Sequence, residues 1–269
     1  MNASQTADQV AVTMARQLGQ FDILQLGLAS ALGQVAACLA KRLCPHLLLE
    51  DPAALTINPT ARKANLTQSE AVALEGATQQ LDASHWIGEI MPTLAGKAGQ
   101  FMRPLEIDVS GKINTLKVQK PSGDWMRIAG LAGLAELAEL ASPYLVYLPS
   151  LDKRSFVEEV QFVVSDPLRH SHAGDQAKVL IVSNLAVIEI DRQGARVASI
   201  HPGVSVDELK QVLPASVLYQ PDKVTEPPSD EELALLNEVD PAKIRELEFL
   251  GGKARLDRLR ELAVVEAAG

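Results

Sequence analysis

Apolar residues near the start of the chain alternate between helical and strand-like spacing. Val10, Met14 and Leu18 fall on one face of a helix that begins after Ser4, a residue type suited to an N-cap. Pro45 ends a second helical stretch, and short apolar runs precede and follow that stretch. The elements predicted here are a helix over 4–18, a strand over 21–26, a helix over 29–43 and a strand over 46–49. Strand, helix and strand in this order predict a βαβ unit with a right-handed crossover.

The second half of the chain has short apolar runs separated by turns, and amphipathic segments near its end. Ser205 and Ser229 are each followed three residues later by glutamate, the sequence signature of a capping box. The polar stretch 51–82 is a long connection, which in a compact enzyme is often an active-site loop. The further predicted elements are a hairpin over 105–118, helices over 128–140, 205–212, 231–239 and 242–249, and strands over 144–148, 156–164, 178–182, 187–190 and 196–200.

Composition narrows the fold class. Hydrophobic residues make up 47% of the 269 residues but aromatic residues only 4%, so the core must be aliphatic, as in helix-covered parallel sheets. The length is near the upper size of a single domain. We therefore expect one α/β domain over 1–250, followed by a weakly anchored helical tail over 251–269.

Charge and cysteine content exclude several classes of partner. The formal net charge of −9 repels nucleic acid and anionic lipid, so neither is expected to bind. Cys38 and Cys44 form no disulfide framework and fit a reducing compartment. The first 20 residues lack the pattern of a signal peptide, and no apolar run approaches the ~20 residues that cross a bilayer. We expect a cytoplasmic protein with no membrane partner.

Four segments carry a resemblance to a known family, in matching order and spacing. They are 107–114 (Ile-Asp-Val-Ser-Gly-Lys-Ile-Asn), 153–160 (Lys-Arg-Ser-Phe-Val-Glu-Glu-Val), 182–187 (Val-Ser-Asn-Leu-Ala-Val) and 200–204 (Ile-His-Pro-Gly-Val). Together they resemble the B subunits of the glutaconate branch of class I CoA-transferases, from residue 3 to about residue 248. The resemblance implies a Rossmann-like open, mostly parallel sheet with helices on both faces. It also implies a homologous A subunit as partner, and a coenzyme A thioester as substrate with no permanently bound cofactor.

The resemblance further implies covalent catalysis by a glutamate on the loop after the second strand. In the family this carboxylate attacks the acyl-CoA thioester and forms an anhydride, which then becomes a glutamyl-CoA thioester. Alignment on Pro45 places Pro52 at the nucleophile, with Glu50 and Asp51 one or two positions earlier. Either a small gap returns Glu50 or Asp51 to the catalytic position, or this chain lacks the carboxylate. Both alternatives stay open.

A second segment, 130–136, resembles the family's glycine-rich loop. Gly130 and Gly133 are kept, while Ala132 replaces the central glycine. In the family this loop offers backbone N–H groups to the developing oxyanion. We therefore name Gly130, Gly133 and Asn184 as candidates for oxyanion and CoA binding. Glu106 stands where the family has an amide, and is either a general base or a solvated charge.

Several activities fit these departures from the family pattern. CoA transfer between carboxylic acids is the default reaction. The alternatives are an acyl-CoA decarboxylase or C–C hydrolase subunit of the same fold, or a non-catalytic scaffold for the A subunit. The decarboxylase branch has a cysteine in place of the glutamate, and none stands there in this chain. His170, His172 and Asp175 lack a further ligand at suitable spacing, so no metal is expected.

Overall fold

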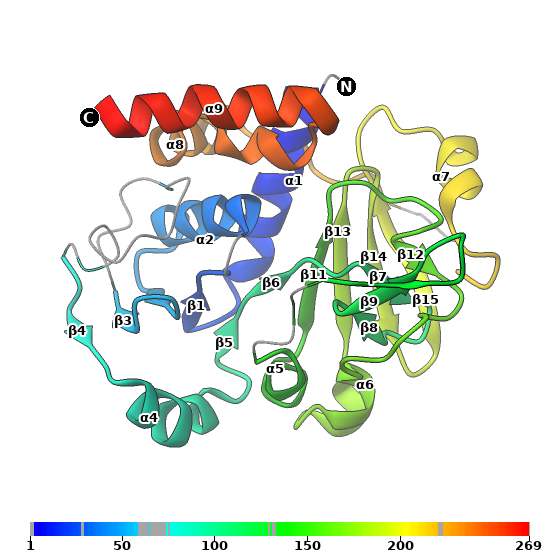
Figure 1. Ribbon diagram of the computed structural model, residues 1–269, viewed down its shortest axis with the longest axis horizontal. Helices are drawn as coiled ribbons and strands as arrows, with labels where there is room; N and C mark the ends of the chain where they lie inside the picture. Colours follow the sequence, from blue (N-terminus) through cyan, green and yellow to red (C-terminus); the bar gives the residue numbers. More distant parts are fainter. Residues whose placement is uncertain are drawn as a thin grey trace. The chain divides into compact units, whose positions relative to one another are not determined.

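The computed structural model describes residues 3–27, 30–58, 64, 74, 76–128, 130, 133–219 and 223–268 (Figure 1). Its contacts separate into two compact units. The first contains residues 1–93, 98–100 and 228–269, and the second contains residues 94–97 and 101–227. The predicted domain boundary at residue 250 and the weak anchoring of the tail stay predictions.

The first unit contains a mixed sheet in the order β4-β3-β2-β1-β5, in which β1 is parallel to both β2 and β5. The antiparallel strands β3 and β4 extend one edge. Its elements are α1 (Ala3–Leu18), β1 (Ile23–Gln25), α2 (Ala31–Leu43), β2 (Leu48–Asp51), β3 (Thr56–Ile57), β4 (Gln79–Gln80), α4 (Ala83–His85), a π-helical turn (Trp86–Ile90), β5 (Ala98–Gly99), α8 (Asp230–Val239), a 3-10 turn (Ile244–Glu248) and α9 (Gly252–Ala268). The parallel pair β1–β2 joined by α2 confirms the predicted βαβ unit.

Helices from both ends of the chain pack together in this unit. The apolar faces of α1 and α2 are buried, and α1 also contacts α8. Arg245 is 1% exposed, and its guanidinium binds three side chains. It donates to Asp8 Oδ1 at 2.6 Å, Asp240 Oδ2 at 2.9 Å and Asn237 Oδ1 at 2.9 Å. This buried cation, with its three side-chain partners, joins the first helix to the C-terminal segment.

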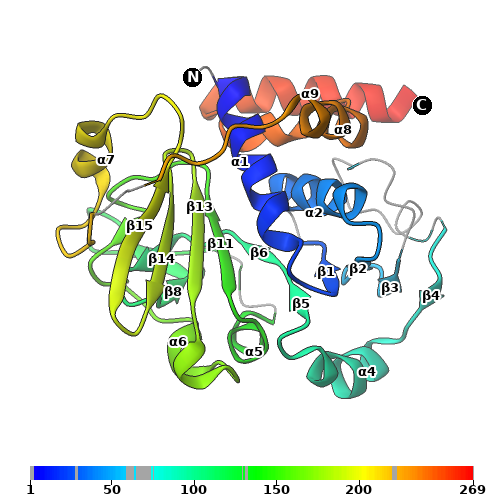
Figure 2. The ribbon, with the colours of Figure 1, turned by 180° about the vertical axis from the view of Figure 1, so that it is seen from behind.

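The second unit contains a five-stranded sheet in the order β15-β14-β13-β11-β6, with β6, β11 and β13 parallel. Strands β13, β14 and β15 run antiparallel and lie side by side (Figure 2). The elements are β6 (Phe101–Met102), β7 (Glu106–Asp108), β8 (Ile113–Asn114), β9 (Lys117–Gln119), β10 (Trp125–Arg127), α5 (Leu134–Leu140), β11 (Tyr144–Leu148), β12 (Phe156–Val157), α6 (Pro167–His170), a 3-10 turn (Gly174–Gln176), β13 (Val179–Ser183), β14 (Ala186–Asp191), β15 (Gly194–Ile200) and α7 (Val206–Val212). A further 3-10 turn, Met91–Leu94, comes earlier in the chain, and its residues 91–93 belong to the first unit.

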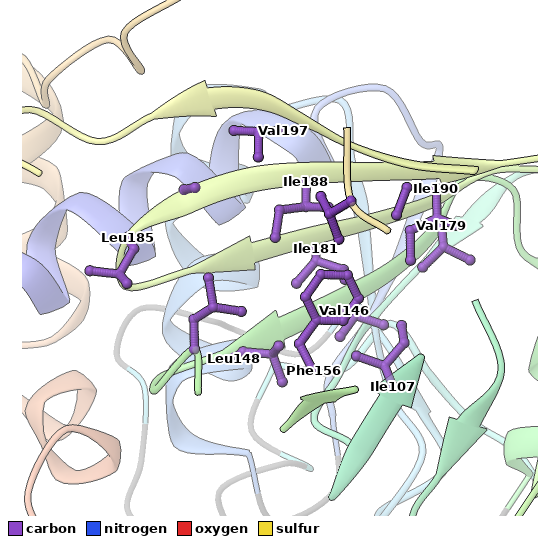
Figure 3. Close-up of a cluster of buried hydrophobic side chains, with 14 of the residues drawn as sticks. Ile107, Val146, Leu148, Phe156, Val179, Ile181, Leu185, Ile188, Ile190 and Val197 are labelled. Carbon is purple, nitrogen blue, oxygen red and sulfur yellow. The ribbon is translucent and has the colours of Figure 1, made fainter. Parts of the chain in front are cut away.

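The core of the second unit lies between this sheet and the smaller sheet β12-β7-β8. Side chains of β11, β13 and β14 point toward Ile107 of β7 and Phe156 of β12 (Figure 3). Apart from Phe156 and Tyr144, the buried residues of this core are aliphatic, as the composition predicted. The α/β class with open, mostly parallel sheets and covering helices is confirmed, with antiparallel strands added at the edges.

Three predicted elements are shorter than the sequence pattern indicated. The strand predicted over 156–164 ends at Val157, because carboxylates of Asp108 and Glu106 accept the following amides of Val160 and Gln161. The helix predicted over 128–140 begins at Leu134, after Gly133 in a left-handed conformation. The helix predicted over 242–249 is a 3-10 turn whose first amides bond to the Asp240 carboxylate.

Candidate functional site

Glu50 is a buried acid near the carboxyl end of β2. It is 1% exposed, and neither carboxyl oxygen has a hydrogen-bond partner among the residues that the structure describes. Burial raises the pKa of Glu50 from its ordinary 4.5 to about 8; the nearby Gln25 amide lowers it somewhat, and the charge of Asp51 raises it. The amide therefore approaches the carboxyl without reaching hydrogen-bond geometry. An unsatisfied buried carboxyl is costly, which marks this position as a candidate site.

Strand register places Glu50 and Gln25 together. Gln25 is the last residue of β1 and pairs directly with Glu50 across the parallel strands. The chain leaves β1 through α2 to reach β2 on one side, while β5 lies on the other side. Ligands of open α/β sheets bind outside the carboxyl ends of strands at such a switch in strand order.

Unlike Glu50, Asp51 is hydrogen-bonded within the turn that follows β2, and Pro52 belongs to the same turn. The Oδ1 atom of Asp51 accepts the amides of Ala53 at 2.9 Å and Ala54 at 3.3 Å, which fixes the turn into β3. Pro52 lies within that turn. The Asp51 carboxyl is therefore already occupied by backbone donors, and the Glu50 carboxyl is not.

The candidates Gly130, Gly133 and Asn184 lie in the second unit, whereas Glu50 and Asp51 lie in the first. Gly130 accepts a short hydrogen bond from the Thr115 hydroxyl through its carbonyl, and a Cβ at this glycine would meet Thr115 O at 2.7 Å. Gly133 has φ of +69° and precedes α5. Ala132 falls outside the described residues.

Asn184 connects two loops of the second unit. Its Oδ1 accepts the Leu151 amide at 2.7 Å, and its own amide donates to Leu148 O at 3.2 Å. Nearby, His201 is buried with Nε2 at 2.7 Å from Ser183 O. Burial lowers the pKa of His201 to about 4, so the imidazole is neutral at physiological pH.

Glu106 is a buried, fully bonded acid rather than a solvated charge. Its carboxylate accepts the Asn114 Nδ2 at 2.7 Å, the Gln161 amide at 3.0 Å and the Gln161 Nε2 at 2.8 Å. These bonds hold β7, β8 and the 160–161 segment together. The arrangement supports a structural role for Glu106.

The part of the chain that the structure describes contains no cluster of potential metal ligands. No three His, Cys, Asp or Glu side chains lie together there as a metal site would need. The Nδ1 of His172 instead contacts the Glu139 carbonyl at 3.0 Å. Cys38 is buried, which raises the pKa of its thiol to about 12, with the charges of Asp240 and Asp51 adding to the effect. The helices within the described ranges also lack the length and hydropathy that a membrane span requires.

An open pocket of about 400 Å³ lies elsewhere in the second unit. Its lining is mixed in charge and polarity: Lys112, Ala135, Glu139, Val163, Val164, Ser165, Asp166, Arg169 and His170. It includes none of the candidate site residues predicted from the sequence.

Comparison with solved structures identifies the fold as that of the class I CoA-transferases. The decarboxylase AibA/AibB matches with a TM-score of 0.78 at 21% identity, over 90% of this chain and 97% of that chain. Glutaconate coenzyme A-transferase from Acidaminococcus fermentans matches with a TM-score of 0.71 at 17% identity, over 92% and 98%. IpdAB from Rhodococcus jostii RHA1 matches with a TM-score of 0.70 at 22% identity, over 91% and 98%. The resemblance to this family, its decarboxylase branch included, is confirmed at the level of the fold. No protein-family model and no curated protein sequence matches the chain.

Two functional candidates were missed from the sequence. Gln25 lies near the end of the strand predicted over 21–26, where it interrupts the apolar run 23–26, and that interruption was the available signal. The hairpin β9–β10 was also missed, although Pro121, Ser122 and Gly123 form a turn signal between two short alternating segments.

Proposed function

We propose that this chain is a B-type subunit of an acyl-CoA-processing enzyme, with Glu50 as its reactive carboxyl group. The buried Glu50 carboxyl without hydrogen-bond partners, at the end of a strand in a CoA-transferase fold, carries the proposal. A homologous A subunit is the proposed partner, in keeping with the two-component names AibA/AibB and IpdAB. The two cysteines support a cytoplasmic location.

In the default reaction, an oxygen of ionised Glu50 attacks the thioester carbonyl carbon. The carbon–sulfur bond breaks, CoA leaves as a thiolate, and an acyl–glutamyl anhydride forms. The thiolate then attacks the glutamyl carbonyl carbon and releases the first carboxylate, which leaves a glutamyl-CoA thioester. An incoming carboxylate reverses both steps with its own acyl group. Gly130, Gly133 and Asn184 remain the proposed oxyanion and CoA-binding residues.

The protonation state of Glu50 sets how the reaction depends on pH. With a pKa of about 8, roughly one Glu50 in ten is ionised at pH 7. Among the described residues, no hydrogen-bond donor stabilises the Glu50 anion in its buried position. The ionised fraction is therefore a strong nucleophile. CoA exchange should therefore rise with pH until Glu50 is fully ionised.

A decarboxylase or C–C hydrolase is the second candidate, and the same pKa favours it. A carboxyl group that is mostly protonated at pH 7 can donate a proton to the carbanion left by carbon–carbon cleavage. The AibA/AibB decarboxylase, with a TM-score of 0.78, supports this alternative. A non-catalytic scaffold for the A subunit is the third, and the buried reactive acid argues against it.

Trapping the covalent intermediate tests the proposal. The chain is co-expressed with a candidate A subunit, incubated with glutaconyl-CoA and acetate, and then reduced with borohydride. We expect mass spectrometry to find Glu50 converted to an alcohol, and Glu50→Gln to abolish both the adduct and CoA exchange. Asp51→Asn serves as the matched control and should retain both. Exchange that survives in Glu50→Gln would overturn the assignment, and CO2 release without exchange would select the decarboxylase.

A further inference from the structure

The hairpin β9–β10 presents two cations and an indole on one face. In the register of this antiparallel pair, Trp125 stands opposite Gln119, and Arg127 stands opposite Lys117. Directly opposite residues, and residues two positions apart in one strand, share a face. Lys117, Arg127 and Trp125 therefore lie on the same side of the hairpin.

The positive charges of this hairpin face have no counter-charge among the described residues. Like charges directly opposite each other destabilise a strand pair, yet Lys117 and Arg127 have this arrangement. Within the ranges that the structure describes, neither of these two side chains forms an ion pair with a carboxylate. Asp124 is the single acidic residue within 116–128, and its Oδ2 accepts the Ser122 hydroxyl at 3.0 Å. The face is suited to an anionic ligand.

The indole of Trp125 is available for stacking. Its side chain is 49% exposed, and the Lys117 ammonium lies 4.6 Å from its ring centroid. The same ammonium lies 4.3 Å from the Phe162 ring centroid. A cation over one indole face is itself favourable and holds the ring in place, so we take the other face as open to a ligand.

The hairpin is held in its conformation before any ligand binds. The Gln119 amide donates to Gln161 Oε1 at 2.7 Å, and the Gln119 side chain donates to Gly123 O at 2.8 Å. The Ile128 amide donates to Leu116 O at 2.7 Å and closes the base of the hairpin. A preformed site loses less ordering entropy on binding.

We propose that this face binds the nucleotide end of coenzyme A, with the adenine ring on Trp125 and the phosphates at Lys117 and Arg127. The inference rests on the proposed function, because it assigns a binding site to the nucleotide part of the proposed thioester substrate. The hairpin also runs directly into the candidate CoA-binding loop: Arg127 precedes Gly130 by three residues. In this arrangement the pantetheine arm of coenzyme A extends from the phosphates on the hairpin toward the candidate CoA-binding loop, where the thioester is expected.

Two other occupants fit this surface less well. Single-stranded nucleic acid also stacks on aromatics beside cations, but a net charge of −9 opposes a long polyanion. An acidic peptide segment of a partner subunit would match the charges, but it would leave the open indole face without an aromatic partner. An oligonucleotide and an acidic peptide are therefore titrated alongside coenzyme A, and tighter binding of either than of coenzyme A would contradict the proposal.

The full chain is titrated with coenzyme A, dephospho-CoA, ADP and pantetheine at low salt, by calorimetry and tryptophan fluorescence. Only two tryptophans are present, and Trp86 is buried, so quenching reports on Trp125. We expect coenzyme A to quench and to bind more tightly than dephospho-CoA, and ADP to quench. Pantetheine should bind at least tenfold more weakly than coenzyme A.

Arg127→Gln should weaken coenzyme A binding about tenfold and leave pantetheine binding unchanged. Arg192→Gln, which removes an exposed arginine paired with Asp175, is the matched control and should have no effect. Equal affinities for coenzyme A and pantetheine, or a tighter fit for oligonucleotide than for coenzyme A, would overturn the inference. So would unchanged coenzyme A affinity in Arg127→Gln. A borohydride-trapped Glu50 adduct alongside such a result would leave the proposed function standing.

Discussion

Gln25 and Glu50 face each other across the parallel strands β1 and β2 without forming a hydrogen bond. An amide beside a carboxyl in the interior of a protein normally pairs with it, because each unpaired polar group costs about 1–3 kcal/mol. The unpaired Glu50 carboxyl is therefore maintained at a cost to stability. Such a cost is expected where a side chain is kept free for a ligand.

The acidity of Glu50 predicts how stability changes with pH. Its pKa is higher in the folded chain, about 8, than the ordinary 4.5, so the folded state binds more protons between these values. The free energy of unfolding should then fall as pH rises from about 4.5 to about 8. Glu50→Gln removes this slope, so the variant should be more stable than the natural chain near pH 9, by up to a few kcal/mol, and similar to it near pH 4.5.

Urea denaturation near the two pH values measures this effect. Glu238→Gln is the control, because Glu238 is exposed and pairs with Arg42 at the surface. It should leave the slope intact. A Glu50→Gln variant with the same relative stability at both pH values would contradict the raised pKa.

Asp51 should prove important for stability. Asp51→Ala removes the acceptor of two turn amides and should lower the free energy of unfolding by about 1–2 kcal/mol. Asp51→Asn keeps a side-chain oxygen and should lose much less. Thermal or chemical denaturation compares the two, and equal losses would show that the negative charge rather than the acceptor matters.

His201 should titrate far below an ordinary histidine. Burial lowers its pKa to about 4, so between about pH 4 and 6.5 the unfolded chain binds a proton that the folded chain does not. Stability from this group is present above pH 6.5 and is lost as pH falls toward 4. NMR titration of the imidazole checks the pKa, and His201→Gln should remove the slope. Titration near 6.5 would disprove the burial effect.

Replacing Arg245 should lower the free energy of unfolding of the first unit more than a substitution at the surface does. Arg245→Met leaves the buried Asp240 carboxylate without its cation and should cost about 3–5 kcal/mol. Arg42→Met breaks an exposed ion pair with Glu238 and should cost under about 1 kcal/mol. Similar losses in the two variants, measured by denaturant unfolding, would mean that the Arg245 network contributes little.

Local signals in the sequence were sufficient where the chemistry is local. The capping box of Ser229 and Glu232 is present as predicted, and the strand Tyr144–Leu148 matches its prediction residue for residue. Prediction failed where distant side chains compete for the backbone. The strand beginning at Phe156 stops because acids some fifty positions earlier, Glu106 and Asp108, bind the amides that would continue it.

The candidate site was predictable only in part for the same reason. Glu50 and Asp51 were both named as candidates from the sequence. Which of the two carboxyl groups stays without hydrogen bonds depends on the folded structure. Asp51 accepts bonds within its own turn, whereas Glu50 meets Gln25 through strand pairing. Neither relationship can be predicted from the local sequence pattern.

The first unit is assembled from both ends of the chain, since Ser4 binds Glu246 at 2.6 Å and the Leu32 amide binds Glu248 at 3.1 Å. During translation the N-terminal helices leave the ribosome more than two hundred residues before these partners. The first unit can therefore be completed only after residues 228–248 have been synthesised, whereas residues 101–227 can already have folded by then. Removal of the segment that carries Glu246 and Glu248 would therefore destabilise α1 and α2, and chaperone dependence should be greatest before that segment is synthesised.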